Sequence, residues 1–282
     1  MIFKNAMSFK AKMSSLGKEK GLLPQYIQQA YLIERFLLKL SKSKYKSNFI
    51  VKGGFLIGGM IGIDSRTTMD LDTTFRGYDL TAKALSEIIP EILATPTNDQ
   101  FVFEFIGVEP IRDDDEYGGF KVKFHATYEK LDVPLSIDVT TGDKITPGEV
   151  SFSLKTMFDD EVIDLLSYNL ETILAEKLET IIVRGELNTR SRDYYDVYIL
   201  SKLKTDQIQF DILAKALAET SKKRQSESSI ADYLIPIEHI RNSGEQQRLW
   251  DKYRRTYSYA SGITLEECLN EVVVMMERII DS

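Results

Sequence analysis

A glycine pair, Gly53-Gly54, is followed sixteen and eighteen positions later by two aspartates, Asp70 and Asp72. In an extended strand alternate side chains share a face, so both carboxylates point the same way while Leu71 points into the core. Like charges held this close need a cation, and hard oxygen ligands suit Mg²⁺ or Mn²⁺. Because glycine lacks Cβ, its backbone amides can approach a triphosphate. Either motif alone is weak, but their order and spacing predict nucleotidyl transfer.

A third carboxylate follows from the apolar alternation between residues 135 and 140. Leu135, Ile137 and Val139 share one face of this predicted strand, which leaves Asp138 on the other. If the strand neighbours the one bearing Asp70 and Asp72, the three side chains meet. Three carboxylates on adjacent strands suit two divalent cations about 3.5 to 4 Å apart. We therefore predict Asp70, Asp72 and Asp138 as metal ligands.

Lys177 interrupts the apolar stripe of a helix predicted over residues 169–184. One explanation is that its stem lies along apolar surface while the ammonium reaches solvent. The other is a partly buried ammonium directed at phosphates. Asp193 and Asp196 are three residues apart and share one face of the next helix, where either could orient Lys177. The stripe consists of Leu170, Ile173, Leu174, Leu178, Ile181 and Ile182.

The patterns predict an α/β chain with a nucleotidyltransferase domain over residues 1–160 and a helical domain over residues 161–282. The first twenty residues are predicted to be basic and turn-rich. The acidic run at 113–116 is predicted to form a solvated hairpin loop in preference to a cation site. The remaining expectations are helices over 24–42, 55–63, 81–93 and 169–184, strands over 49–51, 101–108, 121–128 and 135–140, and a helical tail over 205–282.

Composition limits the class of protein. Apolar residues make up 43% and charged residues 28% of the 282, and no run approaches the ~20 apolar residues of a membrane span. No signal-peptide core follows Met1, which predicts a cytoplasmic protein without a membrane partner. Cys268 is the single cysteine and there are two histidines, so a metal would be held by carboxylates and not by soft ligands.

Charge is unevenly distributed along the chain. Residues 1–52 contain eleven Lys or Arg and two Glu, against a net charge of −7 for the whole chain. This basic segment either contacts a nucleic-acid backbone or solvates one helix and its flanks, and the two interpretations stay open. The aromatic and basic residues at 249–257 likewise predict either an RNA contact or a packed helix with a charged outer face.

The two motif regions together resemble a known family. Val51 to Leu56, followed by Arg66-x-Thr68-x-Asp70-Leu71-Asp72, is similar to the DNA polymerase β-like nucleotidyltransferases, and most to their AbiEii branch. Many superfamily members have Gly-Ser in place of Gly53-Gly54. Gly54 lacks the serine hydroxyl that could contact the phosphates. A second AbiEii-like signature comprises residues 174–178, Arg184 and Ser191-Arg192-Asp193-x-x-Asp196, and Thr141 to Pro147 also resembles that family.

The resemblance implies a fold, a reaction and partners. The fold would be a polymerase β-like mixed sheet with helices, followed by a helical domain. The protein would be a toxin that transfers a nucleoside monophosphate from an NTP to RNA, expected at the tRNA acceptor end, and would pair with a winged-helix antitoxin. Asp138 would help deprotonate the acceptor hydroxyl. The nucleotide-binding set would be Gly53, Gly54, Arg66, Thr68, Lys177 and Arg184.

Three other functions share these motifs. A small-molecule nucleotidyltransferase of the antibiotic-modifying kind has the same glycine and Asp-x-Asp elements. A toxin-like kinase could direct a γ-phosphate to a protein from the same site. A binding protein with a decayed site is least favoured, because all the carboxylates and Lys177 are present.

Overall fold

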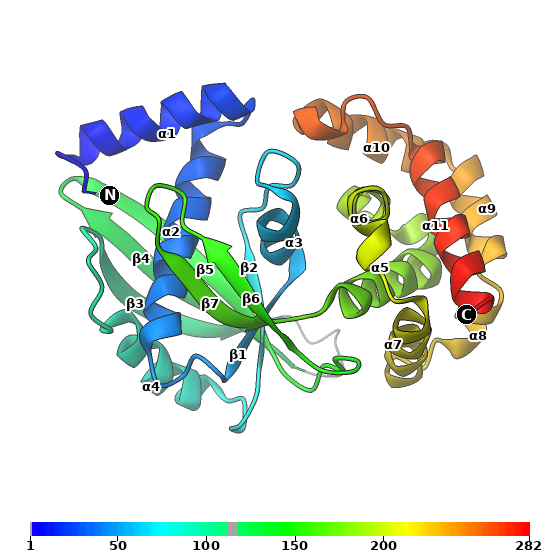
Figure 1. Ribbon diagram of the computed structural model, residues 1–282, viewed down its shortest axis with the longest axis horizontal. Helices are drawn as coiled ribbons and strands as arrows, with labels where there is room; N and C mark the ends of the chain where they lie inside the picture. Colours follow the sequence, from blue (N-terminus) through cyan, green and yellow to red (C-terminus); the bar gives the residue numbers. More distant parts are fainter. Residues whose placement is uncertain (1, 112–117) are drawn as a thin grey trace. The chain divides into compact units, whose positions relative to one another are not determined.

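The computed structural model describes residues 2–111 and 118–282, which form two compact units (Figure 1). Unit 1 comprises Met1–Asp143 and Val150–Ser167, and unit 2 comprises Lys144–Glu149 and Tyr168–Ser282. The acidic run predicted as a hairpin loop lies outside the described residues. None of the described helices is long and apolar enough to cross a membrane.

Unit 1 is built on a mixed sheet that has seven strands in the described part of the chain. Their order is β3-β4-β5-β2-β1-β7-β6. β2 runs parallel to β5 and β1 runs parallel to β7, whereas the other neighbours are antiparallel. The predicted mixed α/β architecture is thus confirmed. The strands are β1 Phe49–Lys52, β2 Leu71–Phe75, β3 Val102–Pro110, β4 Phe120–Tyr128, β5 Leu131–Thr140, β6 Val150–Lys155 and β7 Val162–Ser167.

β6 and β7, which form one edge of the sheet, were not predicted from the sequence. β7 pairs in parallel with β1, the strand that ends at the glycine pair. This pairing stabilises β1. The predicted domain boundary after residue 160 falls between these two strands. Whether the two parts are independently folding domains stays a prediction.

Four helices accompany the sheet in the described part of unit 1 (Figure 1). α2 begins with a proline at its first position, as expected, and Gln29 on it donates to the Met69 carbonyl over 3.1 Å. This hydrogen bond fixes the segment that enters β2. The helices are α1 Ala6–Lys20, α2 Pro24–Lys42, α3 Gly53–Ile61 and α4 Ala82–Leu93.

The turn-rich prediction for residues 1–20 is wrong, because α1 occupies most of that segment. The Asn5 side chain accepts from the Ser8 amide over 2.8 Å, and the Ser8 hydroxyl accepts from the Asn5 amide over 3.1 Å. This reciprocal cap satisfies two amides that have no partner within the helix. Phe9 and Met13, one turn apart, are buried against the rest of the unit.

Unit 2 is helical, as predicted for the tail. Asn169 caps α5 by accepting from the Thr172 amide over 2.7 Å. Its amide group also donates to the carbonyls of Thr146 and Gly148, over 2.7 and 3.0 Å, which ties the segment before β6 to this unit. The helices are α5 Leu170–Arg184, α6 Ser191–Lys204, α7 Phe210–Lys223, α8 Glu227–Ala231, α9 Leu234–Asn242, α10 Gly244–Thr256 and α11 Leu265–Ile280.

The aromatic residues of α10 pack inside unit 2. Trp250 is 1% exposed, and its indole donates to the Ile263 carbonyl over 3.0 Å. Tyr253 lies 4.9 Å from Tyr257 and 6.0 Å from Tyr195, measured between ring centroids. Of the two interpretations of this segment, the packing favours an ordinary helix with a charged outer face.

Candidate functional site

Gly53 and Gly54 form the first residues of α3, immediately after β1 ends. Gly53 has φ +70°, and a Cβ there would lie 2.1 Å from Oδ2 of Asp72. Only glycine therefore lets the Asp72 carboxylate approach the start of the helix. A Cβ on Gly54 would lie 2.8 Å from Nη2 of Arg66. The unpaired amides and the dipole at a helix N-terminus favour anions, which suits both this carboxylate and a phosphate.

Four charged residues lie in register across four neighbouring strands, and we name them the charge row: Lys52, Asp72, Asp138 and Lys121. Lys52 on β1 pairs with Asp72 on β2, Asp72 pairs with Asp138 on β5, and Asp138 pairs with Lys121 on β4. Side chains in register on adjacent strands point to the same face. The predicted neighbourhood of the Asp72 and Asp138 strands is therefore present.

Neither lysine of the charge row was predicted as a site residue, and Lys121 is the one that contacts Asp138. Its Nζ lies 2.7 Å from Oδ1 of Asp138, with the two side chains 36% and 26% exposed. Burial alone would lower the pKa of Lys121. Contact with Asp138 and the negative charges of Asp138, Asp70 and Asp72 outweigh that effect, so its pKa lies above the usual value. Three carboxylates thus act on one ammonium.

Asp70 lies just before β2 and is exposed, with its amide donating to the Thr68 hydroxyl over 3.3 Å. Among the described residues, no group of three or more His, Cys, Asp and Glu side chains is gathered as a metal site. The strand register brings Asp72 and Asp138 together, and Asp70 lies within electrostatic range of Lys121. The three-ligand metal site stays a prediction.

The donor set around Asp138 fits a divalent cation. Oδ1 of Asp138 is buried, and within the described residues its contact with Lys121 lacks the geometry of a hydrogen bond. A buried carboxylate oxygen that is compensated by charge alone is suited to a hard ion such as Mg²⁺ or Mn²⁺. Asp72 and Asp138 would hold the ion, with Asp70 next to them.

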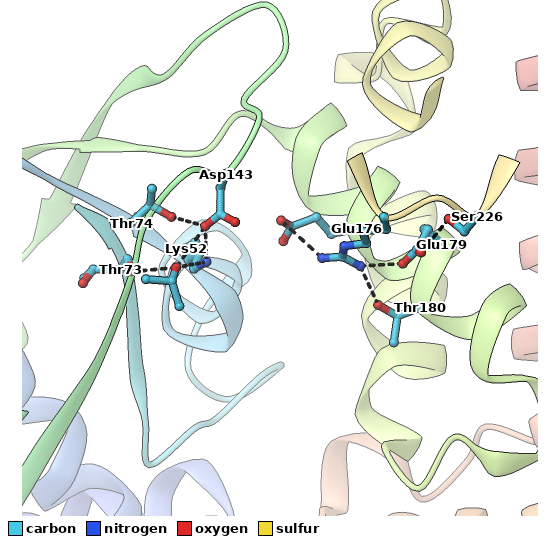
Figure 2. A network of polar contacts seen from close by, with 10 residues as sticks. Lys52, Thr73, Thr74, Asp143, Glu176, Glu179, Thr180 and Ser226 are labelled. Atoms are coloured by element: carbon cyan, nitrogen blue, oxygen red, sulfur yellow. Dashed lines mark hydrogen bonds and ion pairs between the residues drawn. The ribbon is translucent and has the colours of Figure 1, made fainter. Parts of the chain in front are cut away.

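A second polar network fixes the end of β5 (Figure 2). Oδ2 of Asp143 accepts from Lys52 Nζ over 2.6 Å, from the Thr74 hydroxyl over 2.6 Å and from the Thr140 hydroxyl over 3.0 Å. Lys52 also donates to Thr140 over 2.7 Å. Asp143 thus links the ends of β1, β2 and β5. It anchors the residue that immediately precedes Gly53.

In unit 2, Lys177 lies between two aspartates, and these three residues are named the buried trio. Nζ of Lys177 is 2.5 Å from Oδ1 of Asp193 and 3.0 Å from Oδ2 of Asp196. The side chains are 17%, 3% and 0% exposed. The ammonium therefore does not reach into solvent, and the interpretation as a solvated lysine is wrong. Whether Lys177 acts with the charge row stays a prediction.

The remaining predicted phosphate contacts differ in exposure. Arg66 is 4% exposed, and its guanidinium donates to the Thr67 carbonyl. Thr68 is half-buried, and Arg184 is exposed at the last residue of α5. Arg66 thus lies close to Gly54, whereas Arg184 is open to solvent.

A glycine turn at a helix N-terminus, next to carboxylates on adjacent strands of a mixed sheet, defines the nucleotidyltransferase class of fold. The family model described as "Nucleotidyl transferase AbiEii toxin, Type IV TA system" matches residues 35–270. The chain belongs to this family of toxins of type IV toxin–antitoxin systems, as the sequence motifs indicated.

Two solved structures share the fold. A Helicobacter pylori protein, provisionally described as a nucleotidyltransferase, is 18% identical with a TM-score of 0.52, covering 92% of this chain and 96% of its own. JHP933 from the same organism is 17% identical with a TM-score of 0.50, covering 91% and 92%. No curated protein matched this chain.

Proposed function

We propose that this toxin transfers a nucleoside monophosphate from an NTP to an RNA acceptor, with the acceptor end of tRNA as the favoured target. The observation that carries the proposal is the approach of the Asp72 carboxylate to Gly53, where a Cβ would lie 2.1 Å from Oδ2. This contact places a carboxylate and the first amides of α3 at one point. Nucleotidyl transfer requires that combination, because it handles phosphates together with the cations that accompany them.

In the proposed reaction a hydroxyl oxygen of the acceptor attacks the α-phosphorus of the NTP. A new oxygen–phosphorus bond forms, the bond from the α-phosphorus to the bridging oxygen of the β-phosphate breaks, and pyrophosphate leaves. Asp138 accepts the hydroxyl proton, and the amides of Gly53 and Gly54 bind phosphate oxygens. A divalent ion held by Asp70, Asp72 and Asp138 would neutralise phosphate charge.

Lys177 is proposed to neutralise charge that develops on the leaving phosphates. This proposal is supported by the pairing of Lys177 with Asp193 and Asp196, which leaves the ammonium few alternative positions. Arg184 and Thr68 are proposed as secondary phosphate contacts, and Arg66 as a residue that positions Gly54.

The family pairs each toxin with an antitoxin, so this chain has such a partner. That the antitoxin is of the winged-helix type is a proposal that follows from the resemblance. RNA as the acceptor is supported by the basic excess in residues 1–52, which contain eleven Lys or Arg and two Glu.

The test is to incubate the protein with each α-³²P-labelled NTP, Mg²⁺ and total tRNA, and to follow the label. We expect label in tRNA from one nucleotide, with loss of label after Asp138→Asn. The matched control is Asp132→Asn on the same strand, whose carboxylate pairs with His125 over 2.7 Å. Label in an aminoglycoside, or γ-label in a protein, would instead support the rival enzymes, and no transfer from any NTP would contradict the proposal.

A further inference from the structure

The charge row contains an internal cation that stands against the carboxylates proposed to bind metal. Lys121 Nζ is 2.7 Å from Oδ1 of Asp138, and the two residues are register partners on adjacent antiparallel strands. Asp138 is in turn the register partner of Asp72. The ammonium is thus held beside these carboxylates by the pairing of three strands.

Lys121 has the freedom to leave this position. Its side chain is 36% exposed, and the Asp138 side chain is 26% exposed. Ion pairs of this exposure contribute little stability because water screens them and a long side chain loses entropy when it is fixed. The stem of a lysine can swing by several ångströms about its rotatable bonds. The contact is therefore weak enough to exchange.

A second lysine on the same strand provides an internal comparison. Lys123 is two residues from Lys121 on β4, so it points to the same face, but it pairs with Glu109 over 2.6 Å. Its exposure, 42%, is close to that of Lys121. The two lysines thus differ mainly in whether their partner is a carboxylate of the charge row.

We infer that Lys121 is a built-in competitor for the divalent cation: its ammonium neutralises Asp138 and Asp72 in the metal-free protein and must move aside when a metal ion binds. This inference rests on the proposed function, since it concerns the metal of that site. The protein consequently needs a higher concentration of the metal ion for binding than it would without Lys121. In the metal-free protein, Lys121 offsets the repulsion between the two carboxylates.

The test measures Mn²⁺ binding to the full chain without nucleotide, by electron paramagnetic resonance of the free ion, for wild type, Lys121→Met and Lys123→Met. Removing one positive charge a few ångströms from the ion should tighten Mn²⁺ binding by about tenfold or more in Lys121→Met. Lys123→Met should change the affinity by less than about twofold, because Lys123 pairs with Glu109 and not with a carboxylate of the charge row. Lys121→Gln serves as the second variant if the methionine variant does not fold.

A thermal unfolding series supplies a readout that does not depend on activity. In EDTA, Lys121→Met should unfold at a lower temperature than wild type, and saturating Mn²⁺ should remove that difference. If wild type binds Mn²⁺ and Lys121→Met binds it no more tightly, the competition is wrong while the metal site stands. If neither protein binds Mn²⁺, both the competition and the proposed metal site are wrong.

Discussion

The charge row and the buried trio both place lysines next to aspartates, but their side chains differ in exposure. In the charge row the ion pair of Lys121 and Asp138 is 36% and 26% exposed. In the buried trio one lysine serves two aspartates that are 3% and 0% exposed. Exposed pairs are weak and exchangeable, whereas buried charges are costly to separate. The charge row is therefore suited to exchanging its cation, and the buried trio to holding its lysine in place.

The largest effect is expected when the buried trio loses its cation. Lys177→Met removes the ammonium that pairs with Asp193 and Asp196, and breaking a buried ion pair typically costs about 3–5 kcal/mol. Urea unfolding of the single variant measures this loss, and Lys121→Met, expected to lose less than about 1 kcal/mol, is the comparison from the charge row. Adding Asp193→Asn and Asp196→Asn to Lys177→Met should recover part of the loss. Equal stability of the two single variants would erase the contrast between the clusters.

The next effect separates chemistry from stability within the charge row. Asp138→Asn should slow nucleotide transfer by at least about a hundredfold, the contribution of a general base. Because Asp138 is partly exposed, its loss should change the free energy of unfolding by no more than about 1 kcal/mol. Steady-state kinetics and urea unfolding measure both quantities, with Asp132→Asn as the control on the same strand. An Asp138→Asn protein that keeps its transfer rate would remove the row from the reaction.

Gly53→Ala tests whether the glycine turn serves the charge row. The residue has φ +70°, and the new Cβ would meet Asp72 Oδ2 at 2.1 Å, so either the turn or the carboxylate must move. We expect a loss of about 1–3 kcal/mol from backbone strain, together with weaker Mn²⁺ binding. Gly107→Ala is the control, because a Cβ there meets no atom within 4 Å. An unchanged stability and Mn²⁺ affinity in Gly53→Ala would contradict the tight approach of Asp72.

The smallest effect concerns Lys42, Lys44 and Lys46 of the basic segment, which belong to neither cluster. Lys42 pairs with Glu161 over 2.6 Å and Lys44 with Glu91 over 2.7 Å, all well exposed. Reversing Lys42, Lys44 and Lys46 to Glu should weaken tRNA binding and lower its salt slope by roughly two to three, without changing NTP affinity. The control reverses three exposed cations of unit 2, namely Lys215, Lys222 and Arg248. If tRNA affinity and slope stay unchanged, these lysines only solvate the surface.

Much of the fold was predictable from periodicity, because its helices and strands carry regular apolar patterns. The exceptions have physical reasons. In α1 the lysines mask a buried face that Phe9 and Met13 mark at a spacing of four. In β6 the alternation of Val150, Phe152 and Leu154 with polar residues was visible, but the strand pairs with β7 and not with a strand recognised from the sequence.

The site was predictable where it depends on alternation and not where it depends on register. Asp72 and Asp138 follow from the faces of two strands. Lys121 required the turn between β4 and β5: once Tyr128 pairs with Leu131, counting back places Lys121 opposite Asp138. Lys177 showed itself as a charge in an apolar stripe, but its two carboxylate partners come from the packing of α5 on α6.

The most direct test of the contrast follows the lysine side chains themselves while Mg²⁺ is added. In protein labelled with ¹⁵N at the lysine ammonium groups, NMR reports the surroundings of Lys121 and Lys177 separately. We predict that the Lys121 signal moves to that of a solvated lysine as Mg²⁺ saturates Asp72 and Asp138, and that the Lys177 signal keeps its ion-paired position. A Lys121 signal that does not respond to Mg²⁺ would contradict the exchange of Lys121 for the metal ion, and a Lys177 signal that shifts to that of a solvated lysine would contradict a fixed buried trio.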